Sequence, residues 1–104
     1  MKAIVLHNKG DANQLRLEET EIPKIYNDEV LVKLKAASVN HLDVWVRMGN
    51  FSVNYPIIPG SEGAGDIAEI GESVQGFKKG DKVVVLPSIT CMQCEYCLAG
   101  NDNL

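Results

Sequence analysis

Apolar and polar residues alternate along several short stretches of the chain, and this period of two is typical of half-buried β-strands. The clearest stretch is 30–39, where Val30, Val32 and Leu34 fall on one face and two lysines fall on the other. Glycine, proline and asparagine separate such stretches and predict turns between them. Four further strands are predicted on the same grounds, at 2–7, 15–21, 65–70 and 82–86, the last of them buried.

The segment 41–48 interrupts this pattern with apolar residues that lie between a helix-capping residue and a helix-ending one. Asn40 is the expected N-cap and Gly49 the expected stop of a helix of one or two turns. We expect the side chain of Trp45, within this helix, to pack in the core.

Short strands with one short helix predict a mostly β chain, and a small, partly open β-barrel would cover most of its strand edges. The 104 residues suffice for one domain. Three glycines at 60–65 mark a place where the backbone approaches something closely or adopts a positive φ. Their spacing, G-x-x-G-x-G, is not the dinucleotide fingerprint, and no βαβ unit surrounds it.

Composition excludes some function classes. The formal net charge is −4 and no basic run occurs, which argues against a nucleic-acid partner. No apolar run approaches membrane-spanning length, so we expect no membrane partner. The first residues do not resemble a signal peptide, and three cysteines fit a disulfide framework poorly. Reduced thiols and a cytoplasmic location are therefore expected.

The cysteines carry the clearest chemistry. Cys91, Cys94 and Cys97 stand at a strict three-residue spacing, which lets their sulfurs converge on one tetrahedral ion. We favour zinc over unligated surface thiols. A structural zinc normally has four ligands, and nothing in the sequence marks His7 or His41 as the fourth.

Several motifs in order resemble the N-terminal catalytic domain of the medium-chain dehydrogenase/reductase superfamily. That domain has a GroES-like barrel, so the resemblance implies the same fold for residues 1–104. The motifs cover nearly the whole chain: ASVNHLD at 37–43, PGSEGAG at 59–65, GESV at 71–74, FKKGDKV at 77–83 and the cysteine run at 91–97.

The resemblance also explains why the sequence offers only three of the four ligands of a structural zinc. The family's structural zinc motif reads C-x2-C-x2-C-x7-C, which would put the fourth cysteine one residue beyond Leu104. A zinc lobe is thus expected at about 88–104, truncated just before its last ligand. A nucleotide-binding Rossmann domain, absent from this chain, would follow and supply the NAD or NADP site.

The residues at the family's catalytic-zinc ligand positions differ in this chain. Zinc-dependent alcohol dehydrogenases carry Cys where Asn40 stands and His where Ser61 stands, and an amide and a hydroxyl replace these ligands poorly. Asp43 and Glu62 match the family's acidic positions. The set resembles the zinc-free quinone oxidoreductase branch, which implies a retained structural zinc and a lost catalytic one.

Asn40, Asp43, Ser61 and Glu62 are therefore the candidate catalytic residues. His41 is a candidate cofactor contact, because its position lies near the cofactor phosphates in the family. Each has a structural alternative: a helix cap for Asn40, a turn hydroxyl for Ser61, a structural pair for Asp43 and Glu62, and a solvated side chain for His41.

The implied function is the substrate-side domain of an NAD(P)-dependent oxidoreductase. Such an enzyme transfers hydride between nicotinamide and a carbonyl, alcohol or quinone substrate. We expect a homo-oligomeric parent and no activity from the 104 residues alone. The alternative is a free-standing zinc or redox module built on the three cysteines. A co-chaperonin-like role is disfavoured, because the chain lacks a long Gly/Ser-rich loop.

Overall fold

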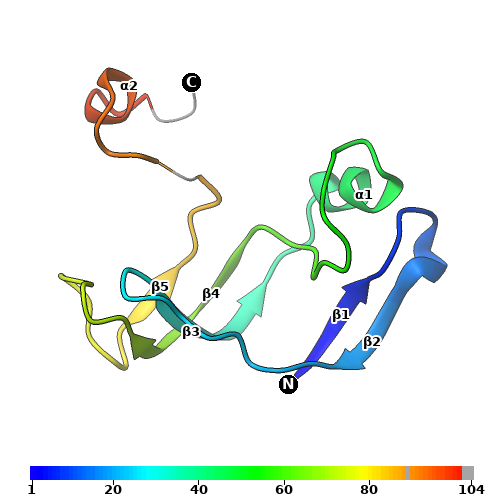
Figure 1. Cartoon of the computed structure of the whole chain (residues 1–104), viewed down its shortest axis with the longest axis horizontal. Helices are drawn as coiled ribbons and strands as arrows, with labels where there is room; N and C mark the ends of the chain where they lie inside the picture. The colour runs from blue at the N-terminus through cyan, green and yellow to red at the C-terminus, as the bar shows by residue number, and fades with distance from the viewer. Residues whose placement is uncertain (89, 102–104) are drawn as a thin grey trace.

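The computed structural model describes residues 1–88 and 90–101 (Figure 1). A strand forms in each of the five predicted segments, with β4 beginning earlier than expected and the other four ending earlier. None of the described helices is long and apolar enough to cross a membrane. In chain order the elements are β1 (Lys2–Leu6), a 3-10 turn η1 (Ala12–Gln14), β2 (Leu15–Glu19), β3 (Val30–Ala37), α1 (His41–Met48), β4 (Gly63–Ile70), β5 (Lys82–Val84) and α2 (Glu95–Leu98).

The strands form two antiparallel sheets. One contains β1 and β2, and the other has the order β3-β4-β5. A single bridge between Leu6 and Ile57 links the first sheet to the segment that precedes β4. Over the described part of the chain both sheets stay open and do not close on one another, and α2 stands apart from them (Figure 1).

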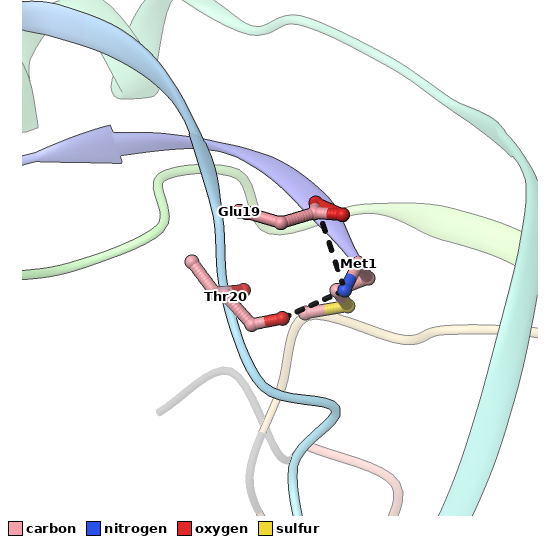
Figure 2. Close-up of polar contacts among 3 residues, drawn as sticks. All are labelled: Met1, Glu19 and Thr20. Atoms are coloured by element: carbon pink, nitrogen blue, oxygen red, sulfur yellow. Dashed lines mark hydrogen bonds and ion pairs between the residues drawn. The ribbon is translucent and has the colours of Figure 1, made fainter.

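Contacts of Met1 hold the end of the first sheet, next to the first residue of β1. The Met1 ammonium donates to the Thr20 carbonyl oxygen at 2.7 Å, and the Thr20 N–H donates to the Met1 carbonyl at 2.7 Å. The Glu19 carboxylate lies 3.9 Å from the same ammonium (Figure 2). An exposed ion pair of this kind contributes at most about 1 kcal/mol, so the backbone bonds secure this end of the hairpin.

The pairing of β3 with β4 contains two irregularities that offset one another. The ladder shifts between Leu31 and Val32, where Ala68 of β4 is left out of the pairing. It shifts back before Ala36, where Lys35 of β3 is left out. Each is a β-bulge, in which one strand carries an extra residue. The ladder then ends with Ala37 opposite Gly63.

The glycine run satisfies both expectations that the sequence raised. Gly60 has a φ of +116°, which other residues rarely adopt. A Cβ on Gly65 would lie 2.0 Å from the Lys33 carbonyl oxygen, so the backbones of β3 and β4 approach too closely for any side chain there. A Cβ on Gly63 would lie 2.7 Å from the Leu34 side chain and at an ordinary contact distance of 3.5 Å from the Ala36 carbonyl oxygen.

Helix α1 has the predicted boundaries. Asn40 is its N-cap, and Gly49 ends it with a φ of +90°. The backbone N–H of Asn40 donates to Asp43 Oδ2 at 2.8 Å, which satisfies one donor at the helix start.

The predicted core position of Trp45 is wrong. Its side chain is 42% exposed and meets the His41 ring edge-on, with ring centroids 4.7 Å apart, because α1 is not enclosed between two layers.

The loop between β1 and β2 is tied to the end of α1. The Gly10 N–H donates to the Arg47 carbonyl at 2.9 Å, and Arg47 Nε donates to the Gly10 carbonyl at 3.2 Å. This reciprocal pair joins the first sheet to the helix that follows β3.

The core is small. Val5, Leu6 and Ile67 are the buried apolar residues of the described chain. The accessible surface of 8288 Å² exceeds the roughly 5,800 Å² of a compact monomer of this mass.

The prediction that 82–86 forms a buried strand is wrong. β5 ends at Val84, which is 79% exposed, because β5 pairs only with β4 in the described sheet.

We predict that Gly65→Ala destabilises the chain by about 3 kcal/mol, because the new methyl group collides with the backbone of β3. Gly63→Ala is the matched control. It should cost about 1 kcal/mol or less, since the Leu34 side chain is 56% exposed and can rotate away. Urea denaturation of both variants measures the difference, and equal midpoints would contradict the close approach at Gly65.

Candidate functional site

The three cysteine sulfurs converge at the start of α2. The Cys91 and Cys97 sulfurs lie 3.7 Å apart, and those of Cys94 and Cys97 lie 3.4 Å apart. A tetrahedral zinc with Zn–S bonds of about 2.3 Å separates its ligand sulfurs by about 3.8 Å. The cluster therefore fits a zinc ion.

Backbone N–H groups point at these sulfurs as well. The N–H groups of Gln93 and Cys94 donate to Cys91 Sγ at 3.5 and 3.3 Å, and the Cys97 N–H donates to Cys94 Sγ at 3.5 Å. The bonds from Gln93 and Cys94 lower the pKa of the Cys91 thiol from 9.0 to about 7. They favour the thiolate, which is the form that binds metal.

The cluster holds three ligands within the described residues. The fourth ligand that the zinc motif implies would follow Leu104. Of the expected lobe at 88–104, Ile89 and 102–104 lie outside the described residues. The lobe remains a prediction in its full extent, and its cysteine centre is a candidate metal site.

A second site is a cleft of about 620 Å³ between the end of β3, α1 and the loop that leads into β4. Its walls are mostly apolar and include Leu34, Val39, Ile58 and Val85. Polar groups are few, which is typical of a small-molecule site with a handful of orienting contacts. They come from Ser38, Asp43, Arg47, Ser61 and Glu62.

The structure brings most of the predicted catalytic residues to this cleft. Asp43 and Ser61 are half-buried in its wall, and Glu62 is exposed at its edge. Asn40 is joined to it through Ser38, because Asn40 Nδ2 donates to Ser38 Oγ at 3.5 Å. His41 is exposed, does not line the cleft and contacts Trp45 instead.

Ser38 was missed by the sequence analysis. Its hydroxyl donates to Glu62 Oε2 at 2.6 Å. The hydrogen bond from Ser38 first, and the nearby Asn40 side-chain amide second, lower the pKa of the Glu62 carboxyl from its usual 4.5. The only signal in the sequence was the motif at 37–43, which contains Ser38 without indicating its partner.

The donor set of the cleft does not fit a catalytic zinc. Its polar side chains offer carboxylates, hydroxyls and a guanidinium, and neither a thiolate nor an imidazole lines it. Over residues 1–88 and 90–101, the only cluster of three or more cysteine, histidine or acidic ligands is the one at Cys91, Cys94 and Cys97. The two sites therefore have different chemistry.

We predict that Cys94→Ser lowers bound zinc from about one ion per chain to nearly none, because two thiolates hold zinc poorly. Gln93→Ala is the matched control, since Gln93 contributes only its backbone N–H. Elemental analysis measures the metal, and circular dichroism should show the β-sheets intact. Collapse of the sheets in Cys94→Ser would show that the lobe supports the core.

Glu62→Gln should change stability in a pH-dependent way. The folded state lowers the pKa of Glu62, so the stabilisation is fully present above about pH 4.5 and is lost as the pH falls through the lower folded value. Urea midpoints of the wild type and Glu62→Gln should therefore differ at neutral pH and converge in acid. Glu21→Gln, at an exposed position outside the cleft, is the control. A difference that persists in acid would contradict the ionised carboxylate.

Comparisons with known proteins agree with the fold. The family model of the alcohol dehydrogenase GroES-like domain matches residues 26–104. Sorbitol dehydrogenase of Bacillus subtilis is 43% identical over the whole chain, which covers 30% of that protein. A cobalt- and zinc-bound alcohol dehydrogenase from Pyrobaculum aerophilum aligns with a TM-score of 0.92 and 39% identity over 99% of this chain and 31% of its own.

Escherichia coli quinone oxidoreductase, solved with NADPH, aligns with a TM-score of 0.77 and 29% identity over 81% of this chain and 26% of its own. The chain spans about three tenths of the length of the curated relatives it matches. The predicted mostly β, GroES-like fold and the family resemblance are confirmed. The chain belongs to the alcohol dehydrogenase GroES-like domain family.

Proposed function

We propose that this chain is the substrate-side domain of an NAD(P)-dependent oxidoreductase. The parent protein would transfer hydride between nicotinamide and a carbonyl, alcohol or quinone substrate. The observation that carries the proposal is the cleft: apolar walls end at hydroxyl and carboxylate groups, in a domain whose relatives are named dehydrogenases and quinone reductases.

In this proposal the chain binds and orients the substrate. The apolar walls exclude water from the substrate carbon chain. The Ser61 hydroxyl can donate to a substrate carbonyl oxygen, and the Glu62 carboxylate can accept from a substrate hydroxyl. Asp43 lines the same cleft and accepts from the Asn40 N–H at the start of α1. The nicotinamide would supply the redox chemistry, held mainly by a nucleotide-binding domain outside these 104 residues. His41 is the proposed contact to that cofactor.

Zinc is proposed to serve structure only. The cysteine cluster has the spacing for it, whereas the cleft lacks the ligands for a second ion. The alignments with the dehydrogenases cover nearly the whole chain, whereas the alignment with the quinone oxidoreductase covers 81% of it. This difference in coverage favours a dehydrogenase-like parent with a zinc lobe. Asn40 and Ser61 favour zinc-free chemistry in the cleft. A free-standing zinc or redox module would leave the cleft without a role.

The test uses the full-length protein that carries this domain. It should oxidise NADPH or NADH with 1,4-benzoquinone, or reduce NAD⁺ or NADP⁺ with 2-butanol, and contain about one zinc per chain. Cys94→Ser should remove that zinc. Absence of nicotinamide-dependent activity with both probes would contradict the oxidoreductase proposal. About two zinc ions per chain, with activity lost on chelation, would contradict the zinc-free cleft.

A further inference from the structure

We propose that Ser38 is a positioning residue that orients Glu62, so that Glu62 accepts a hydrogen bond from a hydroxyl-bearing substrate in the cleft. The inference rests on the function proposed above and deepens it, because it names the group of the substrate that the domain would recognise.

The sheet register brings Ser38 and Glu62 together. Ala37 is opposite Gly63 in the last pair of the β3–β4 ladder, so the next residues of the two strands are Ser38 and Glu62. They face each other across the end of the ladder, and the Ser38 hydroxyl reaches Glu62 Oε2 at 2.6 Å.

The hydrogen bonds run in one direction. A serine hydroxyl has a single proton, and Ser38 uses it to donate the hydrogen bond to Glu62. The Ser38 oxygen then accepts a hydrogen bond from the Asn40 side-chain amide at 3.5 Å. Glu62 Oε2 is occupied by this bond. Glu62 Oε1 accepts no hydrogen bond from the described residues, so it can accept one from a ligand. A carboxylate only accepts, so it selects a ligand that donates, and the O–H of an alcohol is the donor that the proposed function supplies.

The other charged groups of the cleft are engaged elsewhere. Asp43 Oδ2 accepts from the Asn40 N–H at the start of α1, and Arg47 Nε donates to the Gly10 carbonyl. Glu62 and Asp43 each keep one oxygen that accepts no hydrogen bond from the described residues, but Asp43 is tied to the cap of α1, whereas Glu62 is held by a side chain at the end of the ladder that borders the cleft. This divides the two acidic candidates, which the sequence could not separate.

The test compares Ser38→Ala, Ser38→Thr and the control Ser52→Ala in the full-length protein. Ser52 is exposed and outside the cleft. Activity with 2-butanol and NAD⁺ or NADP⁺ is measured against pH. Ser38→Ala should lower kcat/KM about tenfold at neutral pH. It should also move the acidic limb to higher pH, because a carboxylate that loses its donor is protonated more readily. Ser38→Thr keeps a hydroxyl, so its kcat/KM and its acidic limb should match those of the wild type. Ser52→Ala should leave the same two quantities unchanged.

A second measurement does not depend on activity. The ¹³C carboxyl resonance of Glu62, assigned with Glu62→Gln, is titrated in the wild type and in Ser38→Ala. The proposal requires its midpoint to rise in Ser38→Ala. An unchanged midpoint overturns the proposal, as does a loss of activity with an unmoved acidic limb, which would indicate a merely structural role. A raised midpoint in a protein inactive with both nicotinamide probes would overturn the proposed function and the substrate role together, leaving only the hydrogen bond.

Discussion

The antiparallel pairing of β3 with β4 is the constraint on which the cleft depends. It is the contact that leaves no room for a side chain at Gly65, so the two backbones are fixed relative to one another. From its end the chain continues on one side into Ser38 and α1 and on the other into Glu62. The acidic and hydroxyl groups of the cleft come from segments more than twenty residues apart, and only this ladder brings them together.

Local signals in the sequence predicted most of the elements and all of the cysteine cluster. The Val30 alternation, the Asn40 cap and the Gly49 stop depend on short-range chemistry, and a three-residue cysteine spacing needs no tertiary information. The partner of Ser38 depends on where bulges fall between two strands, and nothing local in the sequence marks Lys35 as an extra residue. The exposure of Trp45 and Val84 likewise depends on what covers a helix or a sheet edge, which local patterns do not contain.

The chain keeps its two candidate sites separate. The cysteine cluster is built from one short segment in which backbone N–H groups favour a thiolate. The cleft is built from distant segments, and in it a hydroxyl lowers the pKa of one carboxyl. α2 stands apart from both sheets, so a metal in the lobe would act on the stability of the lobe and not on the groups that line the cleft (Figure 1).

The paired bulges have a consequence for changes in chain length. Lys35 adds a residue to β3 and Ala68 adds one to β4, so each strand compensates for the other. A chain that lost Lys35 alone would still pair Leu34 with Gly65 and Ala36 with Ala64, because the bulge residue already lies outside the ladder, and Ser38 would stay opposite Glu62. Loss of a residue that is paired in the ladder would instead shift the residues beyond it by one position and turn them to the opposite face, because side chains alternate with a period of two. The two bulges are therefore the positions at which these strands can lose a residue without moving the groups at the cleft.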